Sequence, residues 1–160
     1  MVHPFTPGCE SGRIVVCSDP DCTPCRRFAS TVFDRPAVAL DLLDRIALDP
    51  GEVRTDVVCL DEHRRGVGMF TVTGTDDAES VVLIAHMIAD AFGGGGLVAS
   101  VIVASHRPDG GADLDDLERW LEVDAIVSEV GIELVEWFVV GIGGVACPRE
   151  LVDDTDRWAA

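Results

Sequence analysis

One strand, the turn after it and the helix that follows constrain this chain most strongly. Residues 98–104 are apolar and rich in β-branched side chains, which is typical of a buried strand. The polar residues Ser105, His106 and Arg107 come next, and a turn containing proline and glycine leads to a helix expected to begin at Asp113. In α/β proteins, polar side chains gathered at the end of a strand often form a functional site.

Segments with strand and helix patterns alternate over the rest of the chain. We expect two strands joined as a hairpin by Asp61–Arg65, and a further strand after the last helix. The helix that ends near Phe92 is apolar almost all round, which predicts burial against a sheet, with His86 half-buried within it. The sequence therefore predicts an α/β fold with a mixed β-sheet flanked by helices. The expected helices are 36–48, 76–92 and 113–130, and the expected strands are 54–60, 66–72, 98–104 and 132–140.

Three segments resemble a known family. The strand, turn and helix over 98–116 are similar to the signature His-x-His-Pro-Ser-Gly followed by Ser-x-x-Asp. Residues 57–65 are similar to a strand ending in Leu-Asp and a basic turn, and 131–141 to the pattern Gly-Ile-x-Leu-x-Asp-x-x-Ile-Val-Gly. These patterns belong to the JAB/MPN metalloprotease superfamily, and more closely to its RadC-like branch. The resemblance covers about residues 52–151.

The resemblance implies a JAB/MPN-like architecture of the cytidine-deaminase type. It also implies a zinc ion held by two histidines and an aspartate, and an upstream glutamate that activates the zinc-bound water. When Pro108 is placed on the family's proline, Ser105 and Arg107 fall where the two histidines belong. His106 falls between them, and the alternation of side chains along a strand predicts that it faces the opposite way.

Arginine cannot act as a zinc ligand, and its charge weakens the binding of a divalent cation nearby. We therefore expect the zinc-hydrolase motif to be lost. In the wider superfamily inactive members typically pair with another protein, so the resemblance implies a non-catalytic binding or scaffold protein with a protein partner. A homodimer is a further possibility. Ser105, Arg107 and Asp109 are then the candidates for the region of the binding site.

A second hypothesis keeps the hydrolase and rebuilds its ligands. His106, Asp113 and Asp116 would hold the zinc, and Glu52 would serve as the catalytic base in peptide or isopeptide cleavage. Asp113 and Asp116 reproduce the family's Ser-x-x-Asp spacing. The same two residues also suit a helix start, one as the N-cap and the other as an acid in the first turn.

Four cysteines near the start of the chain permit a third hypothesis. Cys9, Cys17, Cys22 and Cys25 could form a structural zinc site, since a C-x2-C pair is one of the usual halves of such sites. Residues 21–26 also resemble a glutaredoxin active-site segment, which implies thiol-redox chemistry. Ordinary structural cysteines remain a third reading. The expected cofactor is therefore zinc or none.

Charge and hydropathy limit the partners. The net charge is −17, and all 12 basic residues are arginine, so the acidic chain should repel nucleic acid. No signal-like start and no apolar run long enough for a membrane span are visible, which predicts a cytoplasmic protein that does not enter a membrane. We divide the chain into a cysteine-containing extension (1–35), a RadC/JAB-like domain (36–151) and an acidic tail (152–160) expected to be loose.

Overall fold

Strands and helices alternate along the chain, as the sequence pattern predicts. The computed structural model describes residues 2–5, 23–46, 49, 51–152 and 157–158. The strands in this part are β1 (Val2–Phe5), β2 (Arg54–Leu60), β3 (Gly66–Thr73), β4 (Ser100–Arg107), β5 (Glu133–Gly141) and β6 (Gly144–Ala146). The helices are α1 (Thr23–Ser30), α2 (Pro36–Ile46), α3 (Ser80–Phe92), α4 (Asp116–Glu129) and the short 3-10 helix η1 (Pro148–Val152).

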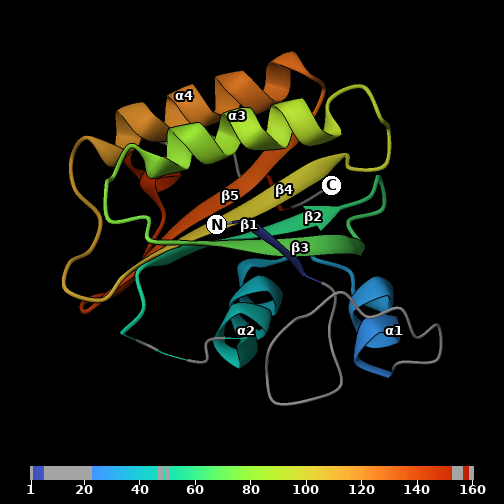
Figure 1. The fold of residues 1–160 in the computed structure, drawn as a ribbon, viewed down its shortest axis with the longest axis horizontal. Helices are drawn as coiled ribbons and strands as arrows, with labels where there is room; N and C mark the ends of the chain where they lie inside the picture. The colour runs from blue at the N-terminus through green and yellow to red at the C-terminus, as the bar shows by residue number, and fades with distance from the viewer. Residues whose placement is uncertain (1, 6–22, 47–48, 50, 153–156, 159–160) are drawn as a thin grey trace.

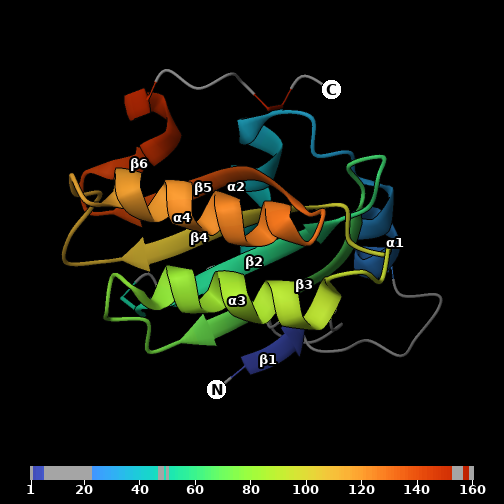
Figure 2. The ribbon, with the colours of Figure 1, turned by 90° about the horizontal axis from the view of Figure 1, so that it is seen from above.

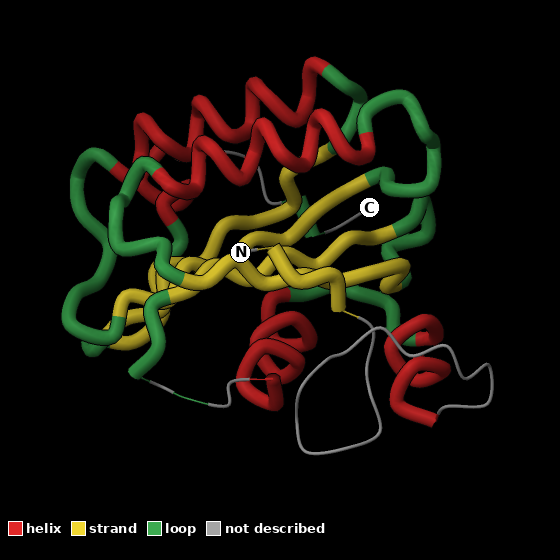
Figure 3. Tube along the Cα trace, in the orientation of Figure 1, coloured by secondary structure: helices red, strands yellow, loops and turns green. Residues whose placement is uncertain are grey.

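The strands form one mixed sheet between two helical layers, in the order β1-β3-β2-β4-β5-β6. Helices α3 and α4 lie side by side over one face, and α1 and α2 lie against the other (Figures 1 and 2). Strands β4 and β5 are parallel, whereas the other neighbouring strands are antiparallel. The predicted α/β class, with a mixed sheet flanked by helices, is confirmed. Figure 3 shows the sheet in yellow between its red helices.

The predicted hairpin between β2 and β3 is confirmed, and its turn has a local cause. Asp61 Oδ1 accepts hydrogen bonds from the backbone N–H groups of His63 and Arg65, at 2.8 and 2.9 Å. An aspartate that binds its own following backbone in this way holds a tight turn. His63 is exposed in this turn, as expected of a solvated residue.

Strand β4 differs from its prediction because it continues through the polar residues to Arg107 instead of stopping near residue 104. Ser105 and His106 pair with Thr55 and Arg54 of β2, and on the other side all three terminal residues pair with β5. Backbone pairing with two neighbours stabilises an extended chain whatever the polarity of its side chains. The candidate site therefore lies on a rigid strand rather than in a loop.

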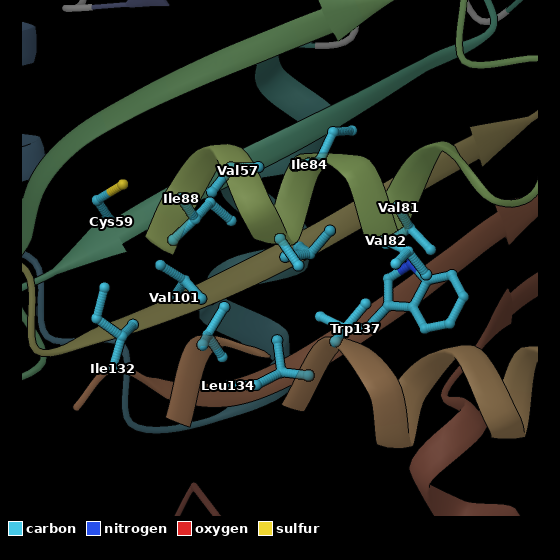
Figure 4. Packing of buried hydrophobic residues seen from close by; sticks show 14 of the residues in the cluster. Val57, Cys59, Val81, Val82, Ile84, Ile88, Val101, Ile132, Leu134 and Trp137 are labelled. Atoms are coloured by element: carbon cyan, nitrogen blue, oxygen red, sulfur yellow. The ribbon is translucent and has the colours of Figure 1, made fainter. Parts of the chain in front are cut away.

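Alternation along the strands divides the buried residues into two clusters. One lies between the sheet and α3 and α4, and Figure 4 shows its packing around Val101 and Trp137. The other lies between the sheet and α2 and includes Ile102, Phe138 and Trp158. Successive residues of β4 thus point into opposite clusters, because side chains along a strand alternate between the two faces of the sheet.

Helix α3 departs from its prediction in two ways. It begins at Ser80 rather than near residue 76, because Asp77 Oδ1 accepts the backbone N–H of Glu79 and holds a turn ahead of the helix. It is also not buried all round: Leu83 is 65% exposed, and His86, expected to be half-buried, is exposed. Only one side of a helix can contact the sheet, so an apolar residue on its outer side remains in water.

None of the described helices is long and apolar enough to span a bilayer.

The prediction of a loose tail is wrong at Arg157 and Trp158. Trp158 is 4% exposed, and its ring centroid lies 6.2 Å from that of Phe138 in the second cluster. The Arg157 guanidinium pairs with Asp124 of α4 and lies 4.9 Å above the centroid of the Trp120 ring. The buried Trp158 indole favours a fixed position for this segment over a solvated one. The Arg157 guanidinium on the face of the Trp120 ring favours it as well.

Candidate functional site

The last residues of β4 point alternately to the two faces of the sheet. Arg107 contacts Asp116 at the start of α4, whereas His106 contacts Asp56 of β2 on the α2 side. His106 therefore faces away from Ser105 and Arg107, as the alternation of side chains predicts. Two polar clusters follow from this arrangement, one on each face.

On the α4 side, Arg107 forms a two-point ion pair with Asp116. Its Nη1 and Nη2 atoms donate to the two carboxylate oxygens at 2.7 and 2.8 Å, and Arg119 Nη1 donates to Oδ1 at 3.1 Å. The Asp116 side chain is fully buried. Burial alone would raise the pKa of Asp116, but hydrogen bonds from Arg107 and from the Asp113 backbone outweigh it and hold that pKa below its ordinary value. The carboxylate is therefore charged and surrounded by donors.

Asp113 and Asp116 also fix the start of α4 by binding each other's backbone. Asp113 Oδ1 accepts the N–H groups of Asp115 and Asp116, at 2.9 and 3.1 Å, and Asp116 Oδ2 accepts the N–H of Asp113 at 2.8 Å. This exchange resembles a capping box, in which two side chains satisfy the free donors of a helix start. The helix proper begins at Asp116 and not at residue 113, because the Asp113 side chain holds a turn before it.

Ser105 occupies the other position where the resemblance implies a histidine. Its Oγ accepts the indole N–H of Trp137 at 3.0 Å and lies 3.4 Å from Thr55 Oγ1, and the residue is 6% exposed. Asp109, in contrast, is exposed in the turn after β4. That turn packs closely on β5: a Cβ atom at Gly141 would lie 2.2 Å from the Gly110 carbonyl oxygen, so only glycine fits there.

The structure does not bring the ligands of the rebuilt zinc site together. His106 is on the α2 side, and Asp113 and Asp116 are on the α4 side. Glu52 precedes β2, where its exposed carboxylate lies 3.8 Å from Arg54 Nη1. Among the described residues, no three His, Cys, Asp or Glu side chains gather as metal ligands would. Of the N-terminal cysteines, Cys9, Cys17 and Cys22 lie outside the described residues, and Cys25 lies on α1.

On the α2 side, the centre of the polar cluster is Asp56, which sequence reasoning missed. It is 1% exposed; His106 Nε2 and Arg54 Nε lie 2.8 and 3.2 Å from its Oδ2, and Thr71 donates to its Oδ1. Burial would raise the pKa of Asp56, but the contacts with His106 and Thr71 and the charge of Arg54 outweigh it and lower that pKa. The signal was present in the sequence, since Arg54 and Asp56 are two residues apart and must share a face.

Arg54 is the buried cation of this second cluster and connects Asp56 to the backbone of Asp49. The residue is 4% exposed, and its Nη1 donates to the backbone oxygen of Asp49 at 3.2 Å. Its Nη2 is buried and has no hydrogen-bond partner among the residues that the structure describes. The cation is thus held in place chiefly by Asp56, and removal of that carboxylate would leave a buried charge uncompensated.

A cavity of about 430 Å³ adjoins His106. It lies between α2 and the ends of β4, β5 and β6, on the face of the sheet opposite to Arg107. Its walls are mostly apolar, with two titratable side chains. The lining residues are Leu40, Leu43, Asp44, His106, Pro108, Val140, Gly141, Ile142 and Val145.

The α4 side is thus closed by ion pairs, and the α2 side offers a cavity with an imidazole in its wall. Comparison with protein-family models and with curated proteins finds no match to this chain. Function must therefore be inferred from the contacts of these residues.

Proposed function

We propose that this protein is a non-catalytic binding protein built on a JAB/MPN-like, RadC-like domain whose zinc-hydrolase motif has been lost. One observation carries the proposal: the guanidinium of Arg107 binds both carboxylate oxygens of Asp116, at 2.7 and 2.8 Å. The resemblance implies that a histidine and an aspartate at these two positions hold zinc. A permanent cation here takes the place of the metal and neutralises the acid that would bind it.

The remaining contacts of Asp116 strengthen the argument. Arg119 and the Asp113 backbone also donate to its carboxylate, so both oxygens are occupied by N–H groups. A zinc ion would have to displace Arg107 and break its ion pair with the fully buried Asp116 carboxylate, which costs free energy. Ser105, at the other ligand position, already accepts the indole N–H of Trp137. The site is therefore organised for stability and not for hydrolysis.

The proposed partner is another protein, and a second copy of this chain is the runner-up. Apolar side chains that could form such an interface stand in water beside the cavity, where Ile142 is 84% and Val145 48% exposed. The net charge of −17 disfavours nucleic acid as a partner, because it repels the phosphate backbone. It also opposes self-association, since two copies would bring like charges together.

Restoration of the two histidines tests the proposal. The variant Ser105→His with Arg107→His presents two imidazoles next to Asp116, and we expect it to gain about one equivalent of zinc per chain after metal removal and reloading. The same variant with Asp116→Asn is the control and should lose that gain. Any zinc held by the N-terminal cysteines is common to all variants and cancels in the comparison.

Two outcomes would contradict the proposal. If His106→Ala removes an equivalent of zinc from the natural sequence, a metal centre survives and the hydrolase hypothesis returns. If the restored variant folds but gains no zinc, the positions of Ser105 and Arg107 do not correspond to the family's ligands, and the kinship on which the proposal depends is wrong.

A further inference from the structure

Helices α3 and α4 together form one outer surface of the molecule. They lie side by side over the same face of the sheet (Figures 1 and 2). At the start of both helices, Glu79 pairs with Arg119 at 2.7 Å. At their ends, a Cβ atom at Gly93 would lie 3.1 Å from the side chain of Val130. The two helices therefore run in the same direction with corresponding turns next to each other, and their outer side chains form a continuous surface.

Part of this surface is apolar. Leu83 and Met87 are both exposed and lie four residues apart on α3, so they stand on the same side of the helix on successive turns. Leu121 of α4 is exposed as well. A single exposed leucine needs no explanation, but apolar side chains repeated at the spacing of a helical turn form a stripe. Such a stripe matches the apolar face of an amphipathic helix.

The exposed aspartates and glutamates of α3 and α4 stand beside this stripe. They are Asp90, Glu118, Glu122 and Glu129, and none of them pairs with a cation among the residues that the structure describes. Glu118 and Glu122 are four residues apart, where like charges repel each other. Asp90 and Glu129 are in the last turns of their helices, at the negative end of the helix dipole. These positions oppose helix stability, and cations from a partner would offset the cost.

The arginines of the chain leave this negative charge unbalanced. Arg119, the one arginine within α3 and α4, is paired with Glu79, Asp113 and Asp116, and its side chain is largely covered. The exposed arginines of the described residues are in α1, in α2, in the loop between them and in the β2–β3 turn: Arg26, Arg27, Arg35, Arg45 and Arg65. The outer surface of α3 and α4 is therefore complementary to a positively charged partner.

We propose that the outer surface of α3 and α4 binds a basic amphipathic helix of another protein. Apolar side chains of the partner pack on Leu83 and Met87, and its lysines or arginines pair with Glu118 and Glu122. An anionic membrane or a nucleic acid would meet the same carboxylates and be repelled. Two copies of this chain joined through this surface would bring like charges together. The inference deepens the proposed binding role, on which it rests, and the surface is separate from the apolar residues beside the cavity.

Calorimetric titration of the full chain with a model peptide tests the proposal. The peptide contains two repeats of Leu-Lys-Lys-Leu-Leu-Lys-Leu, which place leucine and lysine on opposite sides of a helix. One control peptide has glutamate in place of lysine, and another has the same composition in an order that forms no stripe. We expect saturable binding of the basic helix that weakens with added salt, at least about tenfold weaker binding of the reordered peptide, and none of the acidic one.

Paired charge variants separate this surface from the general negative charge of the chain. Glu118→Gln combined with Glu122→Gln should weaken binding of the basic peptide about tenfold, because it removes both proposed partners of the lysines. Asp44→Asn combined with Glu62→Gln removes the same charge from exposed positions outside α3 and α4. This control should change binding less than about twofold.

Leu83→Gln tests the apolar contribution. Leu97, in the loop after α3, supplies the matched control, since it is 67% exposed and Leu83 is 65% exposed. We expect Leu83→Gln to weaken peptide binding at least about fivefold and Leu97→Gln to leave it within about twofold. Both side chains stand in water, so neither substitution should disturb the fold, which circular dichroism checks.

The inference is overturned if the basic peptide does not bind saturably, if the reordered peptide binds as tightly, or if surface and control variants have equal effects. A dimer in sedimentation that Leu83→Gln dissociates would assign the surface to a second copy. Flotation with phosphatidylserine vesicles that Leu83→Gln abolishes would assign it to a membrane, and either result overturns the inference. Zinc reloading reports on Ser105 and Arg107 on the sheet side of α4, whereas these titrations report on its outer side, so the inference and the proposed function can fail separately.

Discussion

Each face of the sheet carries a pair of an arginine and an aspartate near the end of β4, and the two pairs differ in their surroundings. On the α4 side, Arg107 and Arg119 enclose Asp116. On the α2 side, Arg54 holds Asp56, but the other partner of that carboxylate is His106, which lines a cavity. Both oxygens of Asp116 accept hydrogen bonds, whereas on the α2 side His106 Nε2 and Arg54 Nη2 have no hydrogen-bond partner among the described residues.

The comparison teaches that a buried carboxylate need not mark a reactive centre. Asp116 is charged, fully buried and at the end of a strand, yet its oxygens are taken up by the donors that fasten α4 to the sheet. Asp56 also has a lowered pKa and is almost as deeply buried, and its Oδ2 lies 2.8 Å from His106 Nε2. What distinguishes them is whether the last partner of the carboxylate is satisfied or still has a free polar atom.

Of the substitutions in the two clusters, Asp56→Ala should lower the free energy of unfolding most. It leaves the buried Arg54 guanidinium without its close partner, with only the exposed Glu52 carboxylate at 3.8 Å from Nη1, so we expect a loss of about 3–5 kcal/mol in the free energy of unfolding. Urea denaturation measures it as a lower midpoint with an unchanged slope. Asp41→Ala, which breaks an exposed pair with Arg45, is the control and should cost less than about 0.5 kcal/mol. A loss at Asp56 as small as that of the control would show that Arg54 reaches water.

A smaller loss is expected for Asp116→Ala, about 1–3 kcal/mol. The side chains of its partners Arg107 and Arg119 are 17% and 13% exposed, so both can turn partly toward solvent when the carboxylate is gone. Adding Arg107→Ala should recover part of the loss, which a double-mutant cycle measures as coupling. Strict additivity of the two substitutions would mean that the ion pair contributes nothing.

The two clusters should also share a dependence on pH. The pKa values of Asp56 and Asp116 are lowered in the folded protein, so the unfolded chain binds more protons in acid. Their contribution to stability is complete above the ordinary aspartate pKa of about 3.9 and is lost as the pH falls from there toward the folded-state values. Unfolding titrations from about pH 6 to pH 3 should show a shallower loss in Asp56→Asn and in Asp116→Asn than in the natural sequence. Equal slopes in all three proteins would refute the shared origin.

The smallest effect concerns Ser105, whose role on the α4 side is structural. Ser105→Ala removes the acceptor of the Trp137 indole N–H in the core, and a buried donor without a partner costs about 1–2 kcal/mol. Thermal unfolding measures the shift, and Ser105→Thr, which keeps the hydroxyl, should restore most of it. An unchanged melting temperature in Ser105→Ala would mean that Thr55 or water replaces the hydroxyl.

Much of the fold could be predicted because its signals are local. Apolar runs, the Asp61 turn and the proline at the start of α2 locate strands and helices without knowledge of their neighbours. The end of β4 could not be located in this way. Its last three residues are polar, and they remain extended only because β2 and β5 pair with them. The exposure of Leu83 likewise depends on which side of α3 meets the sheet.

The two faces of the candidate site could be predicted only in part. Arg107 and Asp116 are close in sequence and were both singled out as site residues, but their ion pair was not predicted. Asp56 and His106 meet only through the register of β2 against β4, which no local pattern contains. Trp158 was missed for the same reason, since its place beside Phe138 depends on the path of a distant segment.

The position of β2 between β3 and β4 has a consequence for the order of folding. Its partner β3 follows after a short turn, and Thr71 is only 15 residues from Asp56, so the hairpin can form early. Strand β4 is much farther along the chain and must wait for a slower, long-range encounter. We therefore expect His106 to reach Asp56 late in folding, after the hairpin has brought Asp56 and Thr71 together.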